Sequence, residues 1–540
     1  MEHLRSIGNI PSDSRGFTNA QEKRRSVGIE KMIITTPGLH IDAAEMAKVV
    51  GMPEGKIRTG IGINKIRMCG YSESNLTFIA DAMYIFLRKV ASSDIEYGKF
   101  LNENPGKIFL GTESSPEKSR PELMEAMDMA CSKLAMDAKA GKVDGERVRN
   151  IMIILKNASV TEEKFACAGG MLALGNAMDY VSNRSNKSAL VFAADTAVYD
   201  FPEAEITQGA ASSLLWVKRD PQLMEYEGNS ASYNINLPDF TKFGRETPVV
   251  CGNFSTITFV FVVSQAHKNF ELENTGLKCD YIITHTPFPK QVKYFAATFL
   301  IHELKEKNPE LLKSIEDRIG ENPLKRGRFT KHFEDLLEKF SESEETDIVK
   351  FIEQDRELMA YWEWAKKKFA ETEEFKAFKD VMRLDDALIL PSEIGNSYTV
   401  SIFVKWVSLL LNAKEDVEGK SIRSHSYGSG AISEVQQYRV LRVLENDNVI
   451  VKLDDSYPIG ADVYKELHSA HIEGDAKRTM TEESLVEKDK KLLGTERLSE
   501  GFHIVRRFKD GRGDYVFVEN GVEYPIKMVY TISAKTFAPS

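Results

Sequence analysis

The feature that most constrains the fold is the segment 168–181, which is long enough for a helix and apolar on almost every side. A helix of this kind must be covered all round, so it is buried inside a large domain. Strand-like runs flank it at 148–155 and 188–194, and another strand is predicted at 107–111. Cys167 lies in the turn before the helix. The order strand, turn, buried helix, strand predicts a crossover unit of a parallel sheet and an α/β fold.

The length and net charge of the chain limit the classes of protein to which it could belong. A chain of 540 residues with 42% hydrophobic content is too long for one simple domain. The net charge of −10 argues against nucleic-acid binding, which needs a positive surface, although a local basic patch still suits an anionic ligand. The polar N-terminus does not resemble a signal peptide, and no apolar run is long enough to span a membrane.

The cysteines point to a reducing compartment. There are five of them, widely spaced and without a C-x-x-C pair, so a zinc or redox motif is not indicated. An odd number of scattered cysteines in a long chain is typical of reduced thiols in a cytosolic protein. We therefore expect a cytoplasmic protein that does not contact membranes.

The remaining sequence divides by composition. The polar residues 1–25 are predicted to be mobile. A block enriched in Glu, Lys, Phe and Trp interrupts the second half, and its apolar residues recur at helical spacing. The last part contains short β-patterns split by Asp-Gly and Asn-Gly turns. We expect a first half at 26–205, a second half at 206–306 and 386–436, a charged helical insertion at 307–385, and a C-terminal extension at 437–540 that ends in β-strands.

Cys167 is the first chemical candidate. It precedes the apolar helix in the sequence Phe-Ala-Cys-Ala-Gly-Gly. Exposed amides and the dipole at a helix N-terminus favour a thiolate, and the two glycines let a substrate approach the backbone. The alternative is an inert buried cysteine, which is the common fate of a free thiol.

His285 and Glu73 are weaker candidates by pattern alone. His285 follows the predicted strand 281–284, at the edge of the sheet where α/β proteins place functional groups. A capped loop histidine is the commoner outcome. Lys290 is either a residue that binds a phosphate group or an exposed residue in the first turn of a helix. Glu73 precedes a helical stretch at 76–87 and by pattern belongs to a capping region.

Two turns could also contribute. Asn396 lies in a Gly-Asn-Ser-Tyr turn before a core helix, where an Asn is more often a cap than a catalyst. The Ser-Tyr-Gly-Ser-Gly turn at 426–430 brings backbone amides close to a ligand oxygen, but a lone Gly-x-Gly match is a weak signal.

Together, and in this order, these segments resemble the hydroxymethylglutaryl-CoA synthase family of the thiolase superfamily. Seven short motifs in the family's order carry the resemblance, where any one alone would not. They are Gly-Ile-Gly-Ile-Asn-Lys at 60–65 with Glu73 downstream, Leu-Gly-Thr-Glu at 110–113, Cys-Ala-Gly-Gly at 167–170, Ala-Asp-Thr-Ala-Val-Tyr at 194–199, His-Thr-Pro-Phe-Pro-Lys at 285–290, Gly-Asn-Ser-Tyr at 395–398 and Ser-Tyr-Gly-Ser-Gly at 426–430.

The resemblance implies a fold and a reaction. The fold is a thiolase-like, five-layered αβαβα arrangement of two similar halves with a helical insertion in the second half, as a homodimer. The reaction condenses acetyl-CoA with acetoacetyl-CoA to hydroxymethylglutaryl-CoA, in the mevalonate pathway of isoprenoid synthesis. No metal or cofactor is implied beyond the CoA thioester substrates.

The resemblance also implies residue roles. Cys167 is the acetylated nucleophile, Glu73 the general base for the acetyl methyl group, and His285 the group that polarises the acceptor ketone. A thioester methyl is a poor carbon acid, so such a base and an oxyanion donor are both needed. The substrate-binding residues implied are Thr207, Lys290, Asn396, Tyr398, Ser429 and Gly430.

The chain departs from the family at several positions, and other interpretations stay open. Ala166 and Ala168 replace the usual Asn and Tyr beside the nucleophile, and Ser72 replaces an acid before Glu73. One alternative is a synthase of polyketide β-branching that uses carrier-protein thioesters. A ketoacyl synthase shares Cys, His and Asn but needs no glutamate base. A scaffold subunit that docks a thiolase through the block 307–385 is the non-enzyme alternative, although the aromatic residues of that block suit a small core of its own.

Overall fold

The fold is built on one mixed sheet whose two parts repeat each other. The computed structural model describes residues 26–115, 120–245, 247–324, 328–453, 457–474, 483–508 and 513–528, so the segment 1–25, predicted to be mobile, lies outside the described residues. Within these ranges the main sheet has ten strands in the order β11-β12-β13-β8-β1-β7-β6-β4-β5, with β14 beside β1.

The repeat is visible in the strand directions. In the first part, β4 (Asn104–Gly111) is parallel to β6 (Lys187–Thr196), which is antiparallel to β7 (Ala210–Arg219), which is antiparallel to β1 (Val27–Thr35). In the second part, the same directions relate β11 (Tyr281–Thr284), β12 (Ser421–His425), β13 (Ile432–Val440) and β8 (Met224–Asn234). Only the first part has an additional edge strand among the described residues, β5 (Ser159–Glu163), beside β4. The prediction of two similar halves is confirmed.

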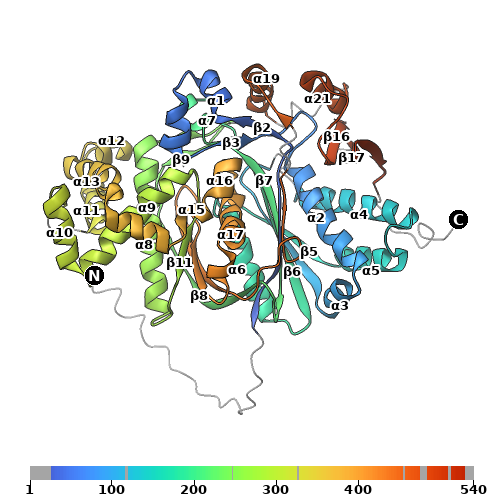
Figure 1. Ribbon diagram of the computed structural model, residues 1–540, viewed down its shortest axis with the longest axis horizontal. Coiled ribbons are helices and arrows are strands. Elements are labelled where there is room, and N and C mark those ends of the chain that lie inside the picture. Colours follow the sequence, from blue (N-terminus) through green and yellow to red (C-terminus); the bar gives the residue numbers. More distant parts are fainter. Residues whose placement is uncertain are drawn as a thin grey trace, which may run out of the picture.

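Helices complete five layers around the two half-sheets. The inner layer is formed by α6 (Gly169–Ser182) and α17 (Ser401–Asn412), with α2 (Asn75–Ser92) and α4 (Leu123–Lys139) outside one half and α8 (Gly252–Glu273) and α9 (Pro289–Lys307) outside the other (Figure 1). Successive side chains of strand β6 point to opposite faces of the sheet, so the strand packs against the inner helices on one face and the outer helices on the other. Val191 packs in the core with α6 and α17, whereas Leu190 and Phe192 pack in the core with α2. The predicted αβαβα fold is confirmed.

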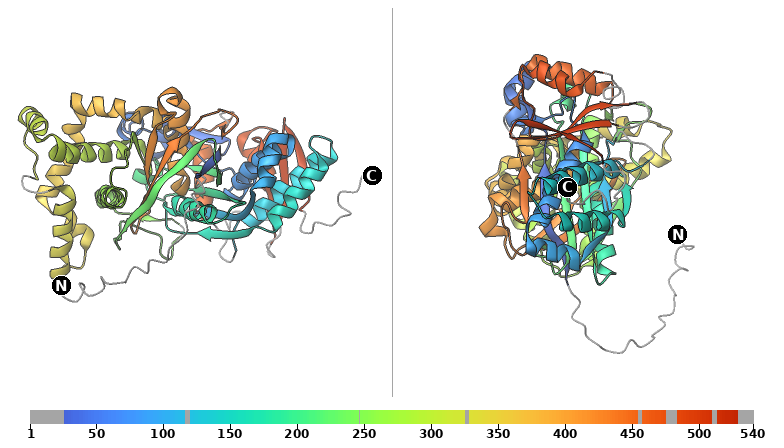
Figure 2. Two further views of the ribbon diagram at one scale, coloured as in Figure 1. Left: turned by 90° about the horizontal axis from the view of Figure 1, so that it is seen from below. Right: turned by 90° about the vertical axis from the view of Figure 1, so that its right-hand side faces the viewer.

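The charged block forms the helices that its periodicity predicts. These helices pack against α8 and α9 and project from one end of the molecule (Figure 2). Tyr361, Trp362 and Trp364 are at most 5% exposed, so these aromatic residues belong to the core of the block. The helices are α10 (Pro309–Ile319), α11 (Phe329–Glu342), α12 (Ile348–Glu353), α13 (Arg356–Lys367), α14 (Glu373–Val381) and α15 (Leu384–Ala387).

The C-terminal region packs against the first half. Strand β14 (Val449–Lys452) pairs with β1, and β15 (Tyr457–Pro458) pairs with β2 (Leu39–Asp42), which pairs with β3 (Lys65–Arg67). The predicted late strands form a separate three-stranded sheet, whose first strand packs against α2. These strands are β16 (Gly501–Arg507), β17 (Gly513–Glu519) and β18 (Val522–Ile526), and the helices of the region are α19 (Ala461–Ile472) and α21 (Leu485–Leu493).

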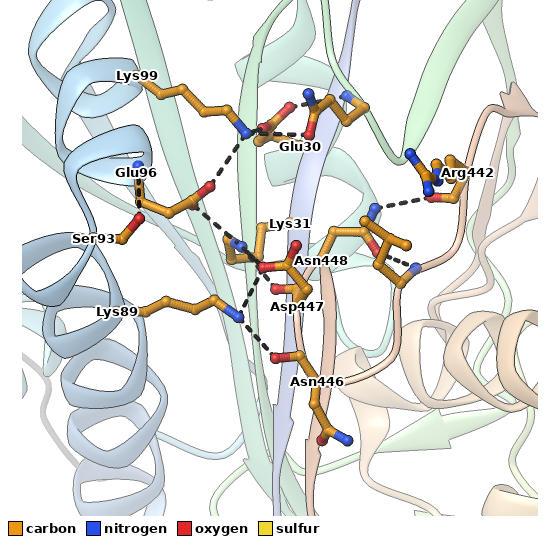
Figure 3. A network of polar contacts seen from close by, with 12 residues as sticks. Glu30, Lys31, Lys89, Ser93, Glu96, Lys99, Arg442, Asn446, Asp447 and Asn448 are labelled. Atoms are coloured by element: carbon orange, nitrogen blue, oxygen red, sulfur yellow. Dashed lines mark hydrogen bonds and ion pairs between the residues drawn. The ribbon is translucent and has the colours of Figure 1, made fainter.

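Balanced charges hold the loop before β14 against the first half. Lys31 of β1 is buried and lies 3.2 Å from Glu96 and 3.5 Å from Asp447 (Figure 3). Lys89 of α2 lies 2.8 Å from the same Asp447. Because each buried charge has an opposite partner, the network joins β1, α2 and the loop without leaving an isolated ion.

One predicted strand is a helix. Residues 148–155 lie within α5 (Gly145–Lys156), whose N-terminus is capped by Asp144, which accepts a hydrogen bond from the Arg147 amide at 2.8 Å. Its apolar residues Val148 and Ile151 face the core at helical spacing. A short apolar run does not distinguish a strand from a buried helix face, which explains the error. The strand of the crossover unit is β5 instead.

The shorter elements connect these layers and shape the site described below. They are α1 (Ala43–Val50), η2 (Lys56–Ile61), α3 (Asp94–Asn102), α7 (Pro202–Glu205), β9 (Phe240–Thr241), β10 (Val249–Val250), η3 (Phe369–Glu371), α16 (Ile389–Ile394), η4 (Tyr398–Val400) and α18 (Lys414–Val417).

Candidate active site

Cys167 lies where the two halves meet, in a cavity of about 440 Å³. It follows β5, and α6 begins two residues later at Gly169. The two glycines after it are needed for close packing. A Cβ atom at Gly170 would approach the Thr399 carbonyl oxygen to 2.8 Å, and one at Gly169 would lie 3.1 Å from the Glu163 carbonyl oxygen. The loop of the second half therefore lies directly on the start of α6.

The group in contact with the thiol is Glu113. The distance from Cys167 Sγ to Glu113 Oε2 is 3.1 Å. Burial, followed by the nearby charge of Asp195, raises the pKa of Glu113 to about 7. Burial and Glu113 also raise the pKa of the Cys167 thiol well above its usual value. The expectation that the helix favours a thiolate is therefore wrong, and the resting pair is a thiol beside its proton acceptor.

Asp195 of β6 holds the loop that carries Glu113. Its Oδ1 accepts hydrogen bonds from the Glu113 amide at 2.8 Å, from both the amide and the hydroxyl of Ser114, and from the Thr112 hydroxyl. Its Oδ2 accepts from the amide and hydroxyl of Thr399, in the second half. One buried carboxylate thus fixes the base loop to the turn before α17.

Glu73 does not lie beside the nucleophile, and its predicted role as the base is wrong. Its carboxylate accepts hydrogen bonds from the Gly70 amide at 3.0 Å and the Ser499 hydroxyl at 3.1 Å. It is buried between the start of α2 and the C-terminal region, and it does not line the cavity. The interpretation as part of a capping region describes its surroundings better. The motif at 110–113 contains Glu113, the carboxylate that does lie beside Cys167.

His285 faces the cavity in its neutral form. It directly follows β11, and its amide donates to the His425 carbonyl oxygen at 2.8 Å, which continues the pairing with β12. Burial, followed by the charge of Lys405, lowers the pKa of His285 to about 3. A neutral imidazole has one N–H donor, so this ring suits hydrogen bonding to a carbonyl oxygen.

Asn396, Tyr398 and Thr207 line the same cavity, where the resemblance puts substrate-binding residues. The Asn396 side-chain oxygen accepts from the Tyr398 amide at 3.0 Å and from the Ser401 hydroxyl at 2.9 Å. This contact fixes the amide group, whose Nδ2 lies 3.4 Å from the Tyr199 hydroxyl. The Thr207 hydroxyl donates to the Ala204 carbonyl oxygen at 2.7 Å.

The turn at 426–430 places one side chain in the cavity wall, and one of its backbone amides binds a carboxylate of the protein. Ser429 lines the cavity. The Gly430 amide donates to Asp239 Oδ1 at 2.9 Å, and Gly430 is outside the cavity lining, so its contact with substrate stays a prediction. Asp239 also accepts from the Tyr427 hydroxyl and thereby holds the turn in place. Lys290, in the first turn of α9, is outside the cavity lining, and its contact with CoA stays a prediction.

Several residues of the cavity wall belong to none of the sequence motifs. Trp362 and Lys366 of α13 bring the charged block to the cavity wall, together with Tyr294 of α9. The Lys366 amino group lies 5.2 Å from the centre of the Tyr294 ring and 5.6 Å from that of Trp362. Their helical spacing indicates only core positions, so the sequence held no signal for this contact.

Neither a metal centre nor a membrane-spanning helix is found in the described part of the chain. Within the described ranges, no group of three or more His, Cys, Asp or Glu side chains is arranged to hold a metal ion. Over the same ranges, no helix combines the length and the apolar character required to cross a bilayer.

Known proteins of one family match most of the chain. The family model for the hydroxymethylglutaryl-coenzyme A synthase N-terminal region matches residues 23–222, and that for the C-terminal region matches residues 328–474, which includes most of the helical block. A hydroxymethylglutaryl-CoA synthase of Haloferax volcanii is 26% identical over 460 residues, covering 83% of this chain and 92% of the relative. One of Enterococcus faecalis is 23% identical, covering 85% and 95%.

Solved structures agree on the fold. MvaS in complex with 3-hydroxy-3-methylglutaryl coenzyme A has a TM-score of 0.59 at 18% identity, covering 92% of this chain and all of that chain. The HMG synthase of the curacin biosynthetic pathway has a TM-score of 0.62 at 14% identity, with the same coverage. At such identities the likeness concerns the fold alone. The family models carry the assignment, and the chain belongs to the hydroxymethylglutaryl-CoA synthase family of acyltransferases.

Proposed function

We propose that this chain condenses acetyl-CoA with acetoacetyl-CoA, through an acetyl group on Cys167, and hydrolyses the adduct to hydroxymethylglutaryl-CoA and CoA. The observation that carries the proposal is the contact between Cys167 and Glu113, together with the cavity that Cys167, His285 and Asn396 line. A nucleophile, a base of raised pKa and neutral donors are the groups that a condensation of thioesters requires.

The first step transfers acetyl to the enzyme. Glu113 accepts the thiol proton as Cys167 Sγ attacks the thioester carbonyl of acetyl-CoA. The C–S bond to CoA breaks, and the departing CoA sulfur takes the proton from Glu113. Contact between thiol and carboxylate lets a thiol of raised pKa react, because charge is never fully developed on sulfur in the buried site.

The second step forms the carbon–carbon bond. Glu113, again a carboxylate, removes a proton from the acetyl methyl group, and the resulting enolate carbon attacks the ketone of acetoacetyl-CoA. His285 and the side-chain amide of Asn396 donate hydrogen bonds to the carbonyl oxygens on which negative charge develops. The new alkoxide takes the proton that Glu113 holds, which restores the base.

The third step releases the product. Water attacks the thioester between Cys167 and the adduct, Glu113 accepts a water proton, and the cysteine sulfur leaves and regains that proton. The same carboxylate thus serves all three steps, which a pKa near 7 suits because both of its forms are accessible at neutral pH.

CoA substrates are favoured over carrier-protein substrates. The fold does not separate the two, because the structural relatives include a curacin-pathway synthase in complex with a donor-ACP. The curated relatives of 23–26% identity are hydroxymethylglutaryl-CoA synthases. Lys366 also lies at the cavity wall, where a cation suits the phosphates of CoA.

We also propose the setting of the enzyme. A homodimer is supported by the edge strand β5, which has β4 on one side and directly precedes the nucleophile turn. The scattered cysteines, none of them in a disulfide among the described residues, suit the cytoplasm and the mevalonate pathway. A thiolase that supplies acetoacetyl-CoA is the candidate partner.

The test separates the half-reactions. The protein is incubated with acetyl-CoA alone, and the peptide that contains Cys167 is analysed by mass spectrometry, with Cys167→Ala as control. We expect one acetyl group on that peptide, and its release as hydroxymethylglutaryl-CoA when acetoacetyl-CoA is added. Absence of the acetyl group would refute the proposal, and acetylation without release by acetoacetyl-CoA would point to a carrier-bound acceptor.

A further inference from the structure

Lys405 is a buried lysine without a partner among the described residues. It lies in the middle of α17, between Val404 and Trp406, and its side chain is completely buried. Its amino group makes no hydrogen bond or ion pair in the part of the chain that the structure describes. Burying a charged group without a partner is strongly unfavourable, so such a residue calls for a functional reason.

The helix places Lys405 directly behind the substrate-positioning residues. It lies one turn after Ser401, on the same helix face, and Ser401 holds the side-chain oxygen of Asn396. Helix α17 packs on the face of β11 that carries Tyr281 and Ile283. Alternation along the strand puts His285 on that face too. His285 therefore lies between the cavity and the helix that carries Lys405.

Within the described ranges, Lys405 has a hydrogen-bond donor without an acceptor, and His285 has an acceptor nitrogen without a donor. Nδ1 of His285 is buried and has no hydrogen-bond partner among the described residues. A lysine amino group offers only donors in its charged form, and a neutral imidazole offers one acceptor nitrogen. Helix α17 packs on β11, so the two groups lie on facing elements, and the charge of Lys405 contributes to the lowered pKa of His285.

We propose that Lys405 is a positioning residue whose amino group donates a hydrogen bond to one buried water, which in turn donates to Nδ1 of His285. This contact fixes the ring as the tautomer with hydrogen on Nε2, the nitrogen left to donate to a ligand in the cavity that His285 lines. The inference rests on the proposed function, in which that N–H binds the ketone oxygen of the acceptor. Without the contact, the ring distributes between two tautomers, and one of them presents a lone pair to the ketone.

The contact predicts a pH dependence. Burial lowers the pKa of Lys405 to about 7. As the pH rises through this value the ammonium loses its proton and becomes a weaker donor, so condensation slows on the alkaline side. Burial is the cause of this shift, and no carboxylate of the described residues hydrogen-bonds with Lys405. The titratable or charged groups on the elements around it are Tyr281, His285, Tyr398, Arg423, His425, Glu30, Lys31, Asp385, Asp386, Glu393, Lys414, Glu415 and Asp416.

The experiment compares two variants with opposite chemistry. Lys405→Met removes the donor, whereas Lys405→Gln keeps an N–H donor that does not titrate. We expect Lys405→Met to lower kcat for condensation about 10- to 100-fold, as loss of an outer hydrogen bond to a functional histidine does. Lys405→Gln should recover most of that rate and lose the alkaline fall. Acetylation of Cys167 from acetyl-CoA alone should stay within about twofold in both, because that step does not use the ketone donor.

A matched control removes a buried lysine that has partners. Lys133 lies 2.6 Å from Asp137 and is similarly buried. Lys133→Met should lower the Tm and leave kcat unchanged, whereas Lys405→Met should raise the Tm while it lowers kcat. Such a rise would also show that the variant folds.

The outcomes distinguish this inference from the proposed function. Normal condensation by Lys405→Met, or an alkaline fall that persists in Lys405→Gln, would overturn the role of Lys405 and leave the proposed reaction intact. A wild-type protein that does not acetylate Cys167 would instead refute the proposed function. Equal loss of acetylation and condensation in Lys405→Met would mark a general structural defect and also overturn the inference.

Discussion

The two halves of the molecule place opposite chemistry at equivalent positions. Strand β4 and its counterpart β11 lead to Glu113 and His285, and β6 and its counterpart β12 end near Asp195 and at His425. The first half therefore presents carboxylates and the second half imidazoles. Burial acts on all of them, but it raises the pKa of Glu113 and lowers that of His285.

The difference teaches how one topology yields both a base and a donor. Burial disfavours the charged form of either group, so a glutamate becomes a stronger base and a histidine stays a neutral donor. The supporting contacts differ as well. Asp195 accepts bonds from several donors, whereas the amino group of Lys405 has no partner among the described residues. In the first half, Asp195 fixes the loop of Glu113 through several hydrogen bonds. In the second half, the amino group of Lys405 lies near the His285 ring that we propose it orients.

The largest effect is expected at the nucleophile of the first half. Cys167→Ala should lower kcat by about 10⁴-fold or more, because the covalent route is lost while the cavity keeps its shape. Steady-state assay of hydroxymethylglutaryl-CoA formation measures this. The matched variant Cys251→Ala removes another partly exposed thiol. Equal losses in both variants would contradict a special role for Cys167.

The next effect separates Glu113 from Glu73, the two glutamates considered as the base. Glu113→Gln should lower kcat by about 10²- to 10⁴-fold, the usual contribution of a general base. Glu73→Gln should leave the rate of folded protein near that of wild type. In wild type, the rate of Cys167 acetylation from acetyl-CoA alone should rise as the pH rises through about 7, because the base must be a carboxylate and this step does not depend on Lys405. A large loss in Glu73→Gln alone would reverse the assignment made from the geometry.

A smaller effect concerns the contact between the halves. Asp195→Asn keeps the size of the side chain but replaces one carboxylate oxygen by an NH2 group. That group is a hydrogen-bond donor, and it would face the N–H and O–H donors that now bind Asp195. We expect a loss of about 3 kcal/mol in the free energy of unfolding, since hydrogen bonds to a buried charge are among the strongest. Urea unfolding at pH 7 measures it. An unchanged midpoint with unchanged activity would mean that Asp195 does not join the halves.

The smallest effect is expected at the cavity wall. Lys366→Ala should raise KM for acetyl-CoA about 5- to 10-fold with little change in kcat, corresponding to about 1 kcal/mol for a partly exposed cation. Lys367→Ala is the matched control, because Lys366 and Lys367 both pair with Glu363, at 3.0 Å and 2.6 Å, but only Lys366 lines the cavity. Similar KM values for the two variants would remove Lys366 from substrate binding.

The sequence predicted the layers better than it predicted the base. The all-round apolar helix and the alternating strands follow from burial alone, so α6, β6 and β11 were found at nearly the right residues. The prediction of a strand at residues 148–155 was wrong because a short apolar run fits either a strand or a buried helix face. Glu113 and Glu73 both precede polar turns, and only the tertiary contact with Cys167 separates them. The missing partner of Lys405 among the described residues is likewise a property of packing, which no local pattern carries.

The pairing of β1 with β14 has a consequence for how the chain is made. One edge of β1 is shared, since Gly28 and Ile29 pair with β8 while residues 32–35 pair with residues 449–452. A ribosome therefore exports the first strand long before it has synthesised the last partner of that strand. Contacts so distant in sequence form slowly and leave strand edges open meanwhile. The newborn protein completes its central sheet only after residues 449–452 have been synthesised, and until then the edge of β1 that they cover stays open to aggregation.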